Sequence, residues 1–166
     1  MSSAEACKMI DELCRRLKSA GCVISDRLPG VDAESRVLMA SKTKFSWKGF
    51  VFLSQHVVVR EISEPKVQDV QQLFDIGFAA AKKVNCVPLL RGMQFGYVVI
   101  PVIVAEVVSP EVRRYVCQAP LNRWCLLELP VICNIRTEET WYFKRTNLWG
   151  ALFFSDLRRL IHQFVK

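Results

Sequence analysis

The sequence predicts a single mixed α/β domain, in which a central mixed sheet of about five to six strands is flanked by helices. Two segments, residues 57–70 and 102–116, share one pattern: an apolar strand, then a serine, a proline and a helix. Further stretches rich in aromatic and β-branched residues are typical of hairpins. No linker or low-complexity run divides residues 1–166, so one globular domain is expected.

The two ends of the chain are predicted to be helical. Over residues 3–20, apolar residues recur at steps of three and four, as on an amphipathic surface helix. Ser3 is the expected N-cap, and Gly21 follows the helix as a C-terminal cap. The same spacing predicts a last helix that begins near Ser155 and continues to the C-terminus.

Between the first helix and residue 62, the sequence favours short strands. Residues 22–28 are predicted as a strand that a Pro-Gly turn closes. Residues 31–44 fit a helix or a loop equally well. Residues 45–53 and 57–62 are expected to form two strands, with the polar residues 54–56 as a tight turn between them.

A helix and a buried strand are predicted next. Ser63 is the expected N-cap of a helix that continues to Val84. Residues 98–108 form an apolar run that does not alternate, which is typical of a strand covered on both faces. Pro101 cannot donate a hydrogen bond, so we expect a bulge there or a strand that is paired on only one side.

The last third of the chain before the final helix is predicted to contain a helix and a hairpin. Ser109 and the proline after it begin a helix that stops before Pro120. Residues 124–135 and 140–144 are expected to pair as an antiparallel hairpin, with residues 136–139 as the turn. The sequence therefore contains two βα units and a hairpin in its C-terminal half.

Length and composition indicate whether the chain is expected in a membrane, outside the cell or in the cytoplasm. The longest apolar run, residues 97–108, is shorter than the roughly twenty residues that cross a bilayer. The N-terminal residues show no secretory signal, so a cytoplasmic protein without a membrane partner is expected. The formal net charge of +7 is a modest excess, and the two signs are mixed along most of the chain.

Cysteines and glycines do not indicate a cofactor. The seven cysteines include no pair two to four residues apart, so no metal site is expected and all are interpreted as reduced thiols. Gly92 and Gly96 precede the apolar strand, whereas phosphate-binding glycines follow one. These two glycines are better explained by a tight loop or by close packing, and no nucleotide cofactor is predicted.

Three carboxylates are the weak catalytic candidates. Glu61 and Glu106 lie at the C-terminal ends of predicted strands, where open α/β sheets place ligands, and Glu128 lies inside an apolar run. If two of them converge, they could bind a divalent metal or serve as acid and base. The alternative is that each is solvated at a strand end or paired with Arg60, Arg113 or Arg123. The two histidines, His56 in the predicted turn and His162 on the last helix, are interpreted as surface or structural residues.

The order of helix, short strands, helix, strand and helix resembles the restriction-endonuclease-like core. That resemblance implies an aspartate and a Glu-x-Lys motif on adjacent strands. Asp26 could be the first carboxylate, but the nearest match to the motif, residues 59–62, has Glu61 without a lysine. The resemblance therefore implies at most a degenerate, nuclease-like relative.

Basic and aromatic residues are interleaved at two places, which is a pattern of single-stranded nucleic-acid sites and also of lysine-protected strand edges. The candidate nucleic-acid-binding residues are Lys42, Lys44, Trp47, Lys48, Lys144 and Arg145.

The function that the sequence favours is a non-catalytic module that binds a protein or a ligand, with self-association as one form of it. Trp47, Trp141 and Trp149 are expected to be exposed and to provide the partner surface. Two hypotheses of other classes remain open: a nucleic-acid-binding or degenerate nuclease-like domain, and a carboxylate- or metal-dependent enzyme that uses Glu61, Glu106 or Glu128.

Overall fold

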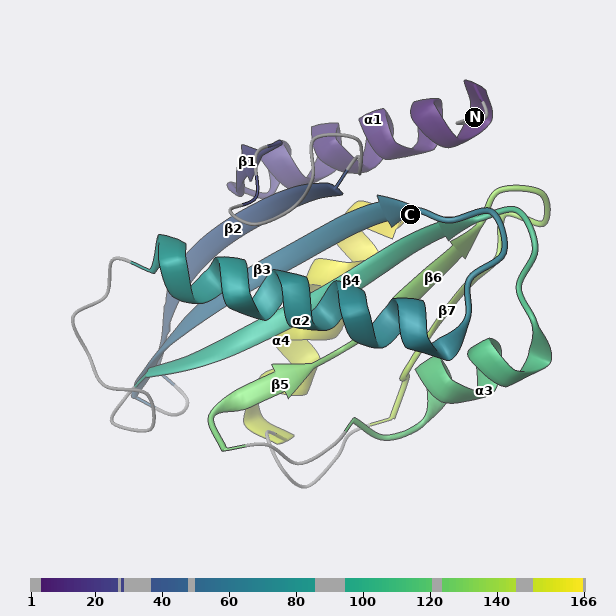
Figure 1. Ribbon diagram of the computed structural model, residues 1–166. Coiled ribbons are helices and arrows are strands. Elements are labelled where there is room, and N and C mark those ends of the chain that lie inside the picture. Colours follow the sequence, from purple (N-terminus) through teal and green to yellow (C-terminus); the bar gives the residue numbers. More distant parts are fainter. Residues whose placement is uncertain are drawn as a thin grey trace.

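The computed structural model describes residues 4–26, 28, 37–47, 50–85, 95–120, 124–145 and 151–165. Figure 1 shows a twisted sheet with helices on both of its faces. The elements in chain order are α1 (Ala4–Ser19), β1 (Val23–Ser25), β2 (Val37–Ser46), β3 (Val51–Glu61), α2 (Val67–Val84), β4 (Phe95–Ala105), α3 (Pro110–Cys117), β5 (Leu126–Glu128), β6 (Val131–Asn134), β7 (Thr140–Tyr142) and α4 (Ala151–Val165).

The sheet is mixed, as predicted, and has seven described strands where five to six were expected. Six strands follow the order β1-β2-β3-β4-β6-β7, and β5 pairs with β4 beside β6. The pairs β1–β2, β2–β3 and β6–β7 are antiparallel, whereas β3, β5 and β6 run parallel to β4. The helix α2 makes the crossover between the parallel neighbours β3 and β4, which confirms the first βα unit.

The strand β4 is the centre of the fold. All eleven of its residues are buried, which fits the prediction of a strand covered on both faces. The expectation about Pro101 is also confirmed. On one side β4 pairs with β3 throughout, but on the other side its partner changes from β5, opposite residues 97–99, to β6, opposite residues 102–105. Pro101 lies where neither β5 nor β6 pairs with β4, so its missing N–H costs little there.

The segment predicted as one strand over residues 124–135 is divided into β5 and β6. Both strands keep the same register against β4, because Val99 faces Glu128 and Val102 faces Val131. Leu129 and Pro130 interrupt the segment. The proline explains the break, because it has no backbone N–H to donate a hydrogen bond to a neighbouring strand. The hairpin of β6 and β7 forms as expected.

Two apolar layers hold the helices to the sheet. On one face α1 and α4 pack through residues such as Leu13, Leu17 and Phe164. On the other face α2 and α3 pack through residues such as Phe74 and Val112. Figure 1 shows α2 on one side of the sheet and α4 behind it. Within the described ranges, no helix has the length and apolar character needed to cross a bilayer.

Three local predictions were wrong. Residues 54–56 are not a turn, because β3 runs through them from Val51 to Glu61 and its antiparallel neighbour β2 ends earlier, at Ser46. The ambiguous segment 31–44 contains most of β2, which begins at Val37, whereas residues 31–36 lie outside the described part. Ser63 does not cap α2: its carbonyl accepts hydrogen bonds from the N–H groups of Glu106 and Val107 instead.

The helix α2 begins later than predicted, at Val67. The carboxylate of Asp69 accepts a hydrogen bond of 2.7 Å from the backbone N–H of Lys66, so an acidic side chain in the first turn satisfies the amide of the capping residue. By contrast, α3 begins as predicted: the hydroxyl of Ser109 accepts from the N–H of Val112, and Pro110 occupies the first turn.

Gly77 allows α2 to lie close to the sheet, and this contact can be tested. A Cβ at this position would lie 2.5 Å from Val58 Cγ2 and 3.0 Å from Val99 Cγ1. Glycine to alanine in a helix normally stabilises by up to about 1 kcal/mol. We expect Gly77→Ala to lower the free energy of unfolding by about 1–3 kcal/mol instead, because it overpacks the core. Urea denaturation measures the difference, with Gln72→Ala on the exposed side of α2 as the neutral control.

Candidate functional site

The three candidate carboxylates do not meet in one site. Glu61 ends β3 and Glu106 follows β4, so both lie at the C-terminal edge of the sheet. Glu128 is buried on β5 opposite Val99, seven residues before Glu106 along β4. At about 3.3 Å per residue, this separation is about 23 Å along the strand direction.

At the C-terminal edge, Glu106 takes part in a local network. Its carboxylate forms a 3.0 Å ion pair with Arg136 Nη2. Asn134, at the end of β6, donates from Nδ2 to the carbonyl of Glu106 and accepts from the N–H groups of Arg136 and Thr137. This arrangement fixes the turn after β6 against the end of β4. Glu106 is therefore paired in a structural contact, but with Arg136 and not with one of the arginines that the sequence suggested.

His56 is buried in the middle of β3, on the face that α2 covers. Its two ring nitrogens contact two serine hydroxyls, Nδ1 with Ser41 Oγ at 2.9 Å and Nε2 with Ser54 Oγ at 2.8 Å. Burial lowers the pKa of His56 from 6.5 to about 4. The neutral ring donates one hydrogen bond and accepts the other, so both serines are satisfied. With His56 and Ser54 each 2% exposed, the group is a polar part of the core.

His162 is exposed on α4, and its Nε2 lies 3.1 Å from the hydroxyl of Tyr142. Burial raises the pKa of Cys133 to about 11 and also raises that of Cys22, so neither of these two thiols is activated. Among the residues that the structure describes, no three His, Cys, Asp or Glu side chains are grouped to hold a metal ion.

The endonuclease resemblance extends to the order of elements only. The described order is helix, three strands, helix and strand, in agreement with it. Asp26 follows β1 and Glu61 ends β3, and the whole of β2 lies between those strands. Glu61 is followed by Ile62 and Ser63, without a lysine. The described residues therefore do not assemble the carboxylate and lysine set of that family.

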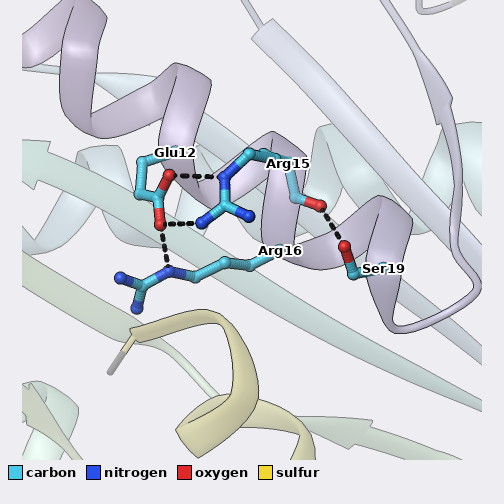
Figure 2. A network of polar contacts seen from close by, with 4 residues as sticks. All are labelled: Glu12, Arg15, Arg16 and Ser19. Atoms are coloured by element: carbon cyan, nitrogen blue, oxygen red, sulfur yellow. Dashed lines mark hydrogen bonds and ion pairs between the residues drawn. The ribbon is translucent and has the colours of Figure 1, made fainter.

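A groove of about 660 Å³ lies between α1, the β6–β7 turn and the end of α4, and it carries charges of both signs. Glu12 and Arg16 of α1 line this groove. Figure 2 shows their contacts: the carboxylate of Glu12 accepts from Arg15 Nε and Nη2 and from Arg16 Nε, at 2.6–2.8 Å. Hydrogen bonds from Arg15 and then Arg16 lower the pKa of Glu12 to about 2. These charges satisfy one another along one helix, as surface pairs commonly do.

The two basic and aromatic groups lie apart. β2 and β7 are separated by β3, β4 and β6, which is about 19 Å at the usual strand spacing. Lys42 donates from Nζ to the carbonyl of Ala20, the residue that follows α1. Lys48 lies outside the described residues. The carbonyls of Lys144 and Arg145 both accept from Arg158 Nη1. The two groups therefore do not form a single stacking site.

An exposed aromatic group does form, at the β2–β3 turn. We call it the aromatic tip: Phe45, Trp47, Phe50 and Phe52. Their rings contact one another with centroid distances of 4.9–6.3 Å, mostly edge to face. The side chain of Trp47 is 75% exposed and that of Phe50 is 63% exposed. Rings of this size are normally buried, so their exposure together needs an explanation.

The backbone of the aromatic tip is also unusual. Phe50 has a φ of 49°, in the left-handed region that hairpin turns normally give to glycine, asparagine or aspartate. A bulky residue in this region is an outlier and costs of order 1–3 kcal/mol. The turn therefore places a phenylalanine where glycine, asparagine or aspartate would adopt the backbone with less strain.

An apolar cavity lies at the same end of the sheet as the aromatic tip but on the face that α4 covers, and we call it the tip pocket. It has a volume of about 230 Å³ and is formed at the N-terminal ends of β3, β4 and β5 with α4 behind them. The lining residues are Val51, Leu53, Phe95, Gly96, Tyr97, Val98, Cys125, Leu126, Leu127 and Phe153. Trp124, which is 65% exposed, lies two residues before the start of β5.

The sequence predicted only some of these exposed aromatic residues. Trp47 was predicted to be exposed and it is, but Trp141 is half-buried with the guanidinium of Arg113 over its ring, and Trp149 lies outside the described residues. Phe50 and Trp124 were not predicted. The close Trp-x-Gly-Phe spacing in residues 47–50 was the available signal, because a turn with two aromatic residues cannot bury both.

Comparison with protein-family models, with curated proteins and with solved structures finds no match for this chain.

The burial of His56 predicts how stability depends on pH. The folded pKa of about 4 lies below the ordinary 6.5, so the unfolded chain binds the extra proton between these values. Stability is then highest above pH 6.5 and falls as the pH decreases toward 4. We expect urea denaturation to show a loss of about 2 kcal/mol from pH 7.5 to pH 5. His56→Gln should remove most of this slope, whereas the exposed His162→Gln should keep it.

Proposed function

We propose that this chain is a non-catalytic binding module that contacts its partner through the aromatic tip. The observation that carries the proposal is Phe50, because its ring is 63% exposed and its backbone is left-handed. Neither feature stabilises the folded chain. Strain and exposed aromatic surface that persist together are characteristic of contact sites.

The amount of exposed aromatic surface supports this proposal. Scattered apolar residues are normal on a protein surface, whereas contiguous patches of several hundred Å² mark interaction sites. The aromatic tip gathers four rings in ring-to-ring contact at one turn. Trp and Phe are also enriched at the centres of protein interfaces.

The enzyme hypothesis receives less support from the geometry. Glu106 is paired with Arg136, and Glu128 lies about 23 Å from it along β4. His56 is enclosed between two serines inside the core. A general acid or base must reach the proton that it moves, and these groups are held in structural contacts.

Nucleic acid is the second candidate partner, because positive charge gathers at the same end of the molecule. The sequence has no Asp or Glu at residues 35–60 or 76–105, the segments that contain the aromatic tip and the start of β4. Lys44 lies on β2 before the tip, and Lys82 and Lys83 lie in the last turn of α2. Figure 1 places that end of α2 on the same side of the molecule as the β2–β3 turn.

The binding-module proposal predicts contact at a defined position. Benzoylphenylalanine in place of Trp47 should give discrete photo-crosslinked adducts in cells that express the full chain. The matched control is Val107, which is also exposed and apolar but lies beyond the opposite end of β4. The proposal is contradicted if position 47 gives no adduct, or if both positions give the same pattern.

The nucleic-acid alternative predicts salt-dependent binding at the same end. If it holds, a labelled single-stranded oligonucleotide should bind with a Kd below about 0.1 mM at physiological salt, and affinity should fall steeply as salt rises. Lys44→Glu should then weaken binding at least about tenfold more than Lys18→Glu, an equal charge change on the exposed side of α1. Fluorescence anisotropy measures both, and equal effects would retire this alternative.

A further inference from the structure

We propose that the partner at the aromatic tip contributes an extended acidic segment, which pairs as an added strand with the exposed edge of β2. We call this edge, residues 42–45, the open edge. In the segment, large apolar residues alternate with aspartate or glutamate. This inference rests on the proposed function, because it names the chemical class of the partner that contacts the aromatic tip.

The open edge is the part of β2 that extends beyond its neighbour β1. β2 pairs with β3 along all ten of its residues, whereas β1 pairs only with residues 39–41. The chain leaves the sheet directly before β1, since the N–H of Cys22 donates to the carbonyl of Leu17 in α1. Figure 1 shows β2 continuing past β1 and the end of α1 toward the β2–β3 turn. Among the described strands, residues 42–45 therefore have a partner on one side only.

The exposure and the length of the open edge suit an added strand. Thr43 and Lys44 are exposed, and the edge ends at Ser46, which is buried. Its four residues span about 14 Å. β1, β5 and β7 are each three residues long, so pairing over such a length already occurs in this sheet. An exposed edge presents backbone N–H and C=O groups at the spacing that another strand matches.

The two faces of the open edge differ in chemistry. Side chains of a strand alternate between its faces. Ala40 packs in the layer of α1 and α4, so Lys42 and Lys44 lie on that face. Met39 packs in the layer of α2 and α3, so Phe45 lies on that face with the other rings of the aromatic tip. One face is therefore basic and the other is aromatic.

An added strand meets both chemistries through consecutive residues. Directly opposite residues of paired strands have Cβ atoms about 4.5–5.5 Å apart on one face. The residue opposite Phe45 thus lies beside that ring, which contacts Trp47 at a centroid distance of 4.9 Å. The next residue lies beside Lys44 on the other face, where a carboxylate forms an opposite-charge pair. Lys42 contributes less, because its Nζ already donates to the carbonyl of Ala20.

The charge around the open edge favours an acidic strand over other occupants. Residues 35–60 contain lysine and arginine but no aspartate or glutamate. Lysines on an edge repel strands that carry positive charge, including the same edge of another copy, and attract strands that carry carboxylates. A single-stranded nucleic acid fits the charge. It does not match the alternating donors and acceptors of the edge as a peptide backbone does.

Fluorescence anisotropy of labelled peptides with the full chain tests the proposal. The probe is an eight-residue peptide in which glutamate and valine alternate. One control peptide has lysine in place of each glutamate, and the other has the same composition with all glutamates placed before all valines. We expect the alternating glutamate peptide to bind at least about tenfold more tightly than either control, and to bind less tightly as salt rises.

Charge reversal at Lys44 tests the contact on the protein side. Lys44→Glu should weaken binding of the alternating glutamate peptide at least about tenfold and should strengthen binding of the lysine peptide. Lys18→Glu makes the same change of charge on the exposed side of α1 and should leave both affinities nearly unchanged. Circular dichroism establishes that each variant is folded, and Lys44→Gln serves as a milder substitution if Lys44→Glu is not.

N-methylation of the peptide distinguishes strand addition from other contacts. In an extended chain, the N–H groups of successive residues point to opposite edges. Methylating the nitrogens of all glutamates and methylating those of all valines therefore block opposite edges of the peptide. We expect one of the two methylated peptides to lose at least about tenfold in affinity and the other to keep its affinity, because only one edge pairs with β2.

Three results would overturn the proposal: no saturable binding of the alternating glutamate peptide up to about 1 mM, equal binding of the two methylated peptides, or equal effects of Lys44→Glu and Lys18→Glu. A labelled single-stranded oligonucleotide that binds where the peptide does not would also overturn it, in favour of nucleic acid. The crosslinker at position 47 separates these failures from that of the proposed function. Adducts that disappear in Lys44→Glu agree with the acidic strand. Adducts that persist there remove the acidic strand but leave a binding module, and the absence of adducts in the parent chain removes both.

Discussion

The complete burial of β4 is the constraint on which the rest of the structure depends. A strand that is covered on both faces and paired on both edges needs helices above and below it and parallel neighbours beside it. α2 supplies the crossover to β3, and the β5–β6 segment keeps one register along the other edge. Once both faces are closed, the described residues present contact surface mainly at the two ends of the sheet.

These two ends differ in chemistry. At the C-terminal end of β4, Asn134, Glu106 and Arg136 satisfy one another's polar groups, and the backbone after the strand is tied to Ser63. At the N-terminal end, exposed rings and an apolar cavity replace such pairs. Polar groups inside the molecule are satisfied locally, as His56 is between its two serines. At this end, large aromatic side chains such as Trp47 and Phe50 therefore remain exposed to solvent.

The sequence predicted the class and order of elements because the spacing of apolar residues in long segments, such as α1 and β4, indicates which of their faces are buried. It failed where a tertiary partner overrides a local signal. Residues 54–56 resemble a turn, yet His56 belongs to a strand because serines beside it in the sheet satisfy its ring. Glu106 and Arg136, thirty residues apart, became a pair only through β4–β6 pairing. Likewise, the tip pocket depends on residues from three strands and a helix, and no local pattern in the sequence reports it.

We propose that the aromatic tip serves contact and not folding. The free energy of unfolding of Phe50→Gly, measured by urea denaturation at a concentration where the chain is monomeric, tests it most directly. Glycine accepts the left-handed backbone without strain and leaves the core untouched. We predict that this variant is as stable as the parent or more stable by up to about 1 kcal/mol. A loss of about 3 kcal/mol or more, the usual result of truncating a core phenylalanine, would contradict the account.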